Sequence, residues 1–141
     1  MKIQTLQEKA EEIVNLYISK YKLEPIKIRV KKLRACGRAR YRTRFLSVPV
    51  WTYEQGGMEY FTAYTIHEVV HFIMHDIHNY KGNHGKKFRE MEILLLKEHN
   101  IVPLEYKKAY YQRMEDVNGK LLWLDTKAKR IKERLKEYEI S

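Results

Sequence analysis

The feature that most constrains this chain is a stretch at residues 59–77 that would be apolar on almost every side of a helix. Such a helix belongs in the centre of a globular protein, because it has no polar face to offer to water. The stretch nevertheless contains His67, Glu68 and His71. Burying these groups costs free energy unless partners satisfy them. The fold must therefore supply such partners inside its core, and a metal ion would be one.

These residues form the motif H-E-x-x-H. Residues four apart lie one turn apart on the same helix face, so both imidazoles can reach one ion. Zinc accepts histidine nitrogen, and a catalytic zinc site combines three protein ligands with one open position. The motif therefore predicts Zn²⁺ bound by His67 and His71, with Glu68 as the general base. The alternative is a group of hydrogen-bonded polar residues in the core.

A third ligand is expected further along the chain. His75 lies one turn beyond His71, and three successive turns cannot converge on one small ion. His84 follows a loop long enough to return over the helix, and Gly85 permits close approach of the backbone there. His84 is therefore the favoured third ligand, and a carboxylate on the next helix, Glu90 or Glu92, is the alternative.

H-E-x-x-H, a short loop and then H-G-x-x-F at His84–Phe88 resemble the SprT-like (Spartan-type) zinc metalloprotease family. The resemblance covers roughly residues 5–100. It implies that His67, His71 and His84 ligate zinc and that Glu68 is catalytic. It also implies a minimal zincin-like domain and activity on proteins attached to DNA. Many family members continue into a zinc ribbon with paired cysteines, whereas this sequence has one cysteine, Cys36.

Periodicity elsewhere predicts an α+β fold, with a small antiparallel sheet packed against the buried H-E-x-x-H helix. The expected helices and strands are an amphipathic helix at 5–22, strands near 26–30 and between 39 and 51, a turn at 55–57, a helix from 84 that stops before Pro103, and a helix at 126–138. Asn118-Gly119, between the segments 114–117 and 121–124, predicts a hairpin. Residues 1–105 are expected to form the SprT-like zincin core, with 106–141 packed on the same single domain.

The segment 27–44 is strongly basic. It contains nine lysines or arginines in eighteen residues and no acid. In one strand, alternate residues share a face, so four arginines are expected to stand together there: Arg38, Arg40, Arg42 and Arg44. Contact with a phosphate backbone and a solvated outer face that protects a sheet edge are both consistent with this cluster.

Composition narrows the setting. The 141 residues carry a net charge of +10, which attracts polyanions such as DNA. A lone cysteine fits a reducing compartment, and no apolar run is long enough to span a membrane. The expectation is a cytoplasmic monomer, with DNA or the nucleoid as an associated partner.

Taken together, the sequence predicts a zinc metallopeptidase acting on a protein substrate. Two alternatives stay open. One is a nucleic-acid-binding protein with a structural zinc, for which a closed site with four protein ligands would be decisive. The other is a zinc hydrolase that cleaves a non-peptide amide, because H-E-x-x-H specifies the metal chemistry and not the substrate.

Overall fold

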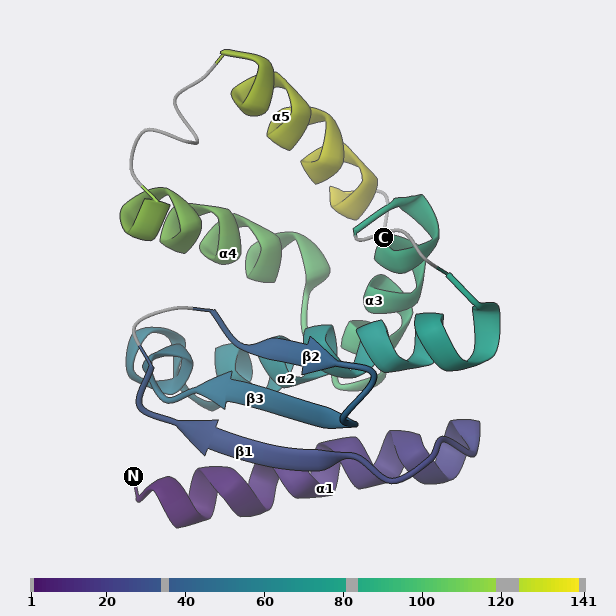
Figure 1. The fold of residues 1–141 in the computed structure, drawn as a ribbon. Coiled ribbons are helices and arrows are strands. Elements are labelled where there is room, and N and C mark those ends of the chain that lie inside the picture. The colour runs from purple at the N-terminus through teal and green to yellow at the C-terminus, as the bar shows by residue number, and fades with distance from the viewer. Residues whose placement is uncertain (1, 34–35, 81–83, 119–124, 140–141) are drawn as a thin grey trace. The chain divides into compact units, whose positions relative to one another are not determined.

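A computed structural model describes residues 2–33, 36–80, 84–118 and 125–139, with side chains described in these ranges except at 113–118 and 125–128. The described part is α+β, with five helices and a three-stranded mixed sheet (Figure 1). The helices are α1 (Ile3–Tyr21), α2 (Trp51–His78), α3 (Lys86–Glu98), α4 (Pro103–Asn118) and α5 (Asp125–Glu139), and the strands are β1 (Lys27–Lys31), β2 (Arg38–Arg40) and β3 (Phe45–Pro49).

The chain divides into two compact units, unit 1 (Met1–Glu92) and unit 2 (Ile93–Ser141). Unit 1 holds α1, the sheet, α2 and the first half of α3. Unit 2 holds the rest of α3, with α4 and α5. The domain boundary expected at residue 105 stays a prediction.

The sheet of unit 1 is mixed, which corrects the antiparallel sheet expected from the sequence. The strand order is β1-β3-β2, with β3 parallel to β1 and antiparallel to β2. The hairpin of β2 and β3 inserts its second strand beside β1, and this insertion makes the β1–β3 pair parallel. Alternation along a strand shows which residues face the core, but it does not show which strands pair.

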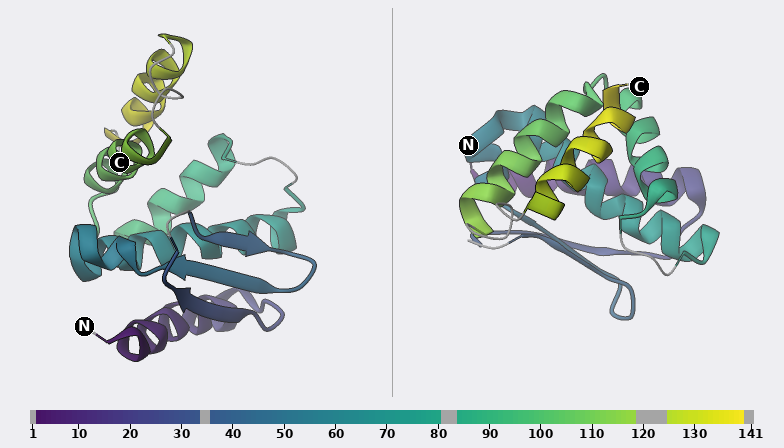
Figure 2. Two further views of the ribbon diagram at one scale, coloured as in Figure 1. Left: turned by 60° about the vertical axis from the view of Figure 1, so that its left-hand side comes forward. Right: turned by 90° about the horizontal axis from the view of Figure 1, so that it is seen from above.

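Both α1 and α2 lie on the same side of the sheet, and no helix of unit 1 covers the other side in its described residues (Figure 2). Helix α1 buries one stripe at helical spacing: Leu6, Ala10, Ile13, Val14 and Tyr17. Its Gln7 side-chain amide bonds both Ile28 O and Val30 N at 2.7 and 2.8 Å. That amide covers the outer edge of β1, which would otherwise be open to another strand.

Helix α2 is the buried central helix expected from its apolar pattern. All residues from Tyr60 to Met74 are buried except His71. The turn expected at 55–57 is a kink within this helix. Only Gly57 leaves helical geometry, with φ of 70° and ψ of −166°, a region that glycine enters without strain. At the other end Asn79 takes a left-handed conformation and ends the helix.

Unit 2 differs from the sequence prediction at its centre. Residues 114–117 were expected to form a strand of a hairpin, but they belong to α4. Pro103 is the first residue of this helix, a position where the missing N–H of proline is tolerated. At the other end, Asn-Gly can stop a helix as well as form a hairpin turn. The partner segment 121–124 lies outside the described residues.

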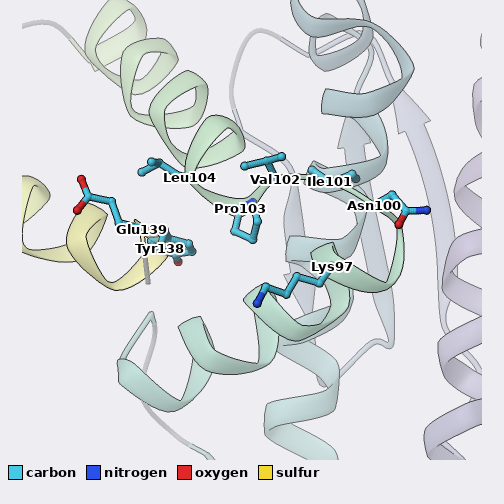
Figure 3. Close-up of a pocket in the computed structure, with 8 residues that line it drawn as sticks. All are labelled: Lys97, Asn100, Ile101, Val102, Pro103, Leu104, Tyr138 and Glu139. Carbon is cyan, nitrogen blue, oxygen red and sulfur yellow. The ribbon is translucent and has the colours of Figure 1, made fainter. Parts of the chain in front are cut away.

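Unit 2 also contains a hollow of about 390 Å³ where α3, α4 and α5 come together (Figure 3). Its walls include Lys97, Pro103, Tyr138 and Glu139. All lining residues belong to unit 2, and none of them is a histidine. The candidate residues His67, Glu68, His71 and His84 all belong to unit 1.

Candidate metal centre

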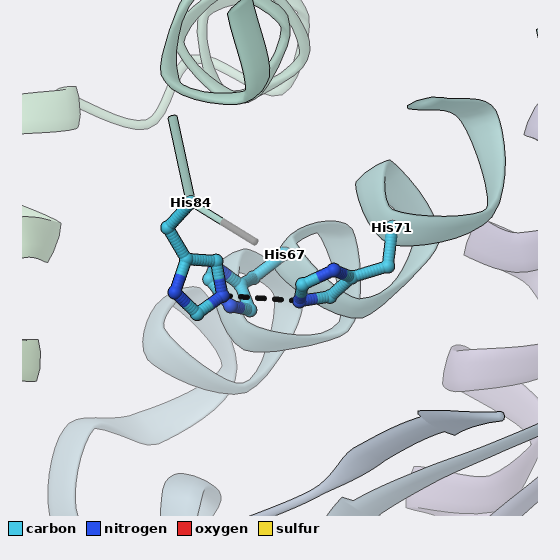
Figure 4. A group of neighbouring side chains, drawn as sticks. All are labelled: His67, His71 and His84. Carbon is cyan, nitrogen blue, oxygen red and sulfur yellow. Dashed lines mark hydrogen bonds between the residues drawn. The ribbon is translucent and has the colours of Figure 1, made fainter. Parts of the chain in front are cut away.

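Three imidazoles converge in unit 1, from two places in the sequence. His67 and His71 project from α2 one turn apart, and His84 comes from the loop before α3 (Figure 4). One ligand nitrogen from each ring lies within 4.8 Å of the other two. Among the described residues, these three histidines form the group, and the structure therefore brings together the three predicted ligands.

The spacing of these nitrogens fits a small ion. His71 Nε2 and His84 Nε2 are 3.1 Å apart. Two histidine nitrogens on one tetrahedral zinc would be about 3.3 Å apart, given zinc–nitrogen bonds of about 2.0–2.1 Å. Neutral imidazole is also a donor that zinc accepts readily. The donor set and its geometry are therefore suited to a zinc ion.

The loop before α3 is held where His84 can reach the helix. The guanidinium of Arg89, one turn into α3, donates to the backbone oxygen of His84 at 2.5 Å. Gly85 allows the Tyr80 hydroxyl to approach, since a Cβ at position 85 would lie 1.8 Å from that oxygen. The close approach expected at Gly85 is thus present.

Phe88 explains the apolar position of the H-G-x-x-F pattern. This ring is 1% exposed and lies against all three imidazoles, with centroid distances of 5.2 Å to His67, 4.6 Å to His71 and 5.0 Å to His84. It closes one side of the site to water and limits how far the imidazoles can rotate.

Each helix histidine also contacts a second side chain through Nδ1. His67 Nδ1 lies 2.5 Å from Glu92 Oε2, and both side chains are buried. His71 Nδ1 lies 3.3 Å from the Tyr41 hydroxyl. The sequence offered Glu92 as an alternative metal ligand, but in the structure its carboxylate contacts Nδ1 of His67. Tyr41 had no signal in the sequence that set it apart from ten other tyrosines.

Glu68 is buried beside this cluster, at 4% exposure. Burial first, and then the negative charge of Glu92, raises the pKa of Glu68 to about 8. Its charge in turn helps to raise the pKa of Tyr41, after burial. Glu68 thus lies close enough to Glu92 and Tyr41 to interact with both electrostatically.

The arginine cluster is arranged differently from the prediction that Arg38, Arg40, Arg42 and Arg44 share one strand face. Strand β2 ends at Arg40, and the chain reverses over residues 41–44, where Arg44 N–H bonds Tyr41 O at 3.3 Å. Arg44 adopts a left-handed φ of 54° and forms an ion pair with Asp76 at 2.8 Å. A strand that included all four arginines would leave no residues for this turn.

Basic side chains of the sheet nonetheless lie together on one surface, although the set of residues differs from the four arginines that were predicted. Paired residues in neighbouring strands point to the same side. The registers Arg29↔Ser47↔Arg38 and Lys27↔Phe45↔Arg40 therefore place exposed cations from both outer strands on one face. This cationic face consists of Lys27, Arg29, Lys31, Arg38 and Arg40, and it is the side that α1 and α2 leave uncovered (Figure 2).

Comparison of the chain with protein-family models, with curated proteins and with solved structures gave no match. What the site can do is therefore inferred from its own residues. Among the described residues, no helix combines the length and the apolar character needed to cross a lipid bilayer.

Proposed function

We propose that this protein is a zinc-dependent peptidase whose metal ion is held by His67, His71 and His84. The observation that carries the proposal is the convergence of three imidazole nitrogens within 4.8 Å, next to a buried glutamate. Three protein donors suit a catalytic zinc site, because they leave one coordination position for a reactant. A closed structural site would need a fourth donor.

A zinc ion held there would supply Lewis acidity, which makes water a nucleophile near neutral pH and polarises a carbonyl. Glu68 would take the proton from the attacking water and return it to the leaving amine. A zinc ion beside Glu68 would favour the ionised carboxylate, which is the form that accepts a proton. Phe88 would help to exclude bulk water from one side of the site.

The proposal includes a zincin-like fold and the resemblance to the SprT-like family. Both rest on H-E-x-x-H, on the loop and on H-G-x-x-F, whose apolar member Phe88 lies against the three imidazoles. A cytoplasmic location also belongs to the proposal, based on the lone cysteine of the 141 residues.

Hydrolysis is tested with the zinc-loaded protein, casein and an unstructured peptide, with simple amides as comparison substrates. Glu68→Gln is expected to keep zinc and to lose about 100-fold or more of the cleavage rate, the contribution of a positioned base. Glu59→Gln, exposed on the same helix, is the matched control and should cleave normally. Full activity of Glu68→Gln would remove this residue from the mechanism, and cleavage of the amides alone would favour a non-peptide substrate.

A second function, binding of nucleic acid, is favoured by the cationic face of the sheet. Five exposed cations on one uncovered surface match a phosphate backbone, which is recognised through charge without reading of sequence. DNA bound there would fit a peptidase that acts on DNA-associated proteins. It would equally fit a nucleic-acid-binding protein in which zinc is structural.

This binding is tested by fluorescence anisotropy with single-stranded DNA over a range of salt concentrations. The double variant Arg38→Ala/Arg40→Ala should bind more weakly and should lower the slope of log K against log salt by about 1.4, since each single-strand phosphate contact contributes about 0.7. Lys20→Ala, an exposed cation on α1, is the control. An unchanged slope in the double variant would contradict a role for the cationic face.

A further inference from the structure

The two helix histidines are each bonded on the side away from His84. His67 Nδ1 meets Glu92 Oε2 at 2.5 Å, and His71 Nδ1 meets the Tyr41 hydroxyl at 3.3 Å. The two partners come from different elements, since Glu92 lies in α3 and Tyr41 in the turn between β2 and β3. Neither partner follows from the H-E-x-x-H motif.

The chemistry of Glu92 determines the tautomer of His67. An ionised carboxylate only accepts hydrogen bonds, so the nitrogen facing it must carry a proton. With Nδ1 protonated, a neutral His67 has its lone pair on Nε2. Glu92 is 0% exposed and His67 is 3% exposed, so water does not compete for this bond.

Tyr41 can act on His71 in the same way. Its ring stacks on His75 at 4.2 Å with an interplanar angle of 8°, and it meets Phe72 edge-on at 5.6 Å. These contacts fix the ring and therefore the position of the hydroxyl. Burial, with further contributions from Glu68 and Asp76, raises the pKa of Tyr41, so the hydroxyl stays neutral and can accept the Nδ1–H of His71.

The other nitrogen of His71 faces the remaining ligand. His71 Nε2 lies 3.1 Å from His84 Nε2. A metal ion can occupy this place only if both Nε2 atoms present a lone pair, which requires the proton of His71 to lie on Nδ1. The hydroxyl of Tyr41 is the group placed to hold it there.

We propose that Glu92 and Tyr41 are positioning residues that accept the Nδ1–H of His67 and of His71, so that both helix imidazoles present Nε2 to one metal ion. This inference rests on the metal centre of the proposed function but not on peptidase activity. Such partners of metal-bound histidines orient the ring and raise its basicity, and losing one lowers metal affinity about 10- to 100-fold.

The first test is zinc affinity, measured by competition with a chromogenic chelator. Glu92→Leu should weaken binding about 10- to 100-fold, and Glu92→Gln, which keeps an acceptor oxygen, should recover part of that loss. Tyr41→Phe keeps the stacked ring and should weaken binding by up to about tenfold. Glu90→Gln and Tyr53→Phe are the matched controls. Wild-type affinity in both Glu92→Leu and Tyr41→Phe would overturn the inference.

The second test reads the tautomers directly, by nitrogen-15 spectra of the imidazoles. In the zinc-loaded wild type, His67 and His71 should both carry the proton on Nδ1, and coordination of zinc through either Nδ1 would overturn the assignment. In zinc-free protein at about pH 8, His67 should be the Nδ1–H tautomer in the wild type and in Glu92→Gln. The Nε2–H tautomer of His67 in the wild type would overturn the role of Glu92, even if the protein proved to lack peptidase activity.

Discussion

At the scale of single residues, the fold strongly changes the acidity of Glu68. The pKa of this carboxyl is raised from an ordinary value of 4.5 to about 8, first by burial and then by the charge of Glu92. Without metal, the folded protein therefore keeps a proton on Glu68 that the unfolded chain releases above about pH 4.5. The free energy of unfolding therefore falls as the pH rises from about 4.5 to about 8.

This direction of the pH dependence gives a prediction for the metal-free protein in the presence of EDTA. Between about pH 5 and pH 8 the free energy of unfolding of the wild type should fall relative to that of Glu68→Gln, by up to about 1.4 kcal/mol per pH unit. Denaturant titrations of both proteins at several pH values measure this difference. A difference that stays constant or rises across the window would show that Glu68 is not a buried carboxyl with a raised pKa.

The grouping of the three histidines was predictable from the sequence because their geometry is local. His67 and His71 are four apart on a helix, and His84 follows His71 by only 13 residues. The residues behind the ligands were not predictable. Tyr41 meets His71 across 30 residues of sequence, through a turn whose packing on α2 has no local signature. Glu92 was predicted only as an alternative third ligand, and its bond to His67 Nδ1 depends on how α3 packs beside α2.

At the scale of elements, the turn between β2 and β3 determines what its side chains can reach. Arg44 anchors this turn to the end of α2 through Asp76, at 2.8 and 2.9 Å, and to Glu24 O at 2.9 Å. Burial of Asp76 is outweighed by its bonds to Arg44 and His75, so the pKa of Asp76 lies below its ordinary value. The contribution of this pair to stability is present above the ordinary pKa and is lost as the pH falls through the lowered one.

Arg44 should therefore matter for stability rather than for binding of nucleic acid. Arg44→Ala should lower the free energy of unfolding by about 1–2 kcal/mol at pH 7, since the pair is charge-assisted and only partly buried. Its effect on DNA affinity should be smaller than that of Arg38→Ala/Arg40→Ala, which should leave stability nearly unchanged. Denaturant unfolding and anisotropy on the same preparations measure both quantities. The opposite ranking would place Arg44 in the binding surface.

Element types were easier to predict than their pairing. The apolar periods predicted α1, the buried part of α2, α3 and α5, because apolar residues recur in these segments at helical spacing. Sheet topology was missed, since the alternation in β1 and β2 gives the exposed face but no partner. The strand expected at 114–117 was wrong because the prediction rested on Asn-Gly, which ends a helix as readily as it forms a hairpin turn.

At the scale of the whole molecule, the three proposed metal ligands all lie in unit 1, and an ion held by them would join α2 to His84, which lies before α3. An ion that binds only the folded state adds RT ln(1 + [L]/Kd) to stability. At a free zinc concentration of 100 times Kd, the gain should be about 2.7 kcal/mol. Thermal unfolding with zinc and with EDTA measures it, and equal midpoints in the two conditions would count against a metal bound by the folded protein.

The most direct test of the account is the zinc content and zinc affinity of single histidine variants. The wild type should bind one zinc ion per chain. His67→Ala, His71→Ala and His84→Ala should each weaken binding by at least about tenfold, whereas His78→Ala, on the same helix, should bind like the wild type. A His84→Ala variant with wild-type affinity, or a wild type that binds no zinc, would contradict a metal centre built from these three residues.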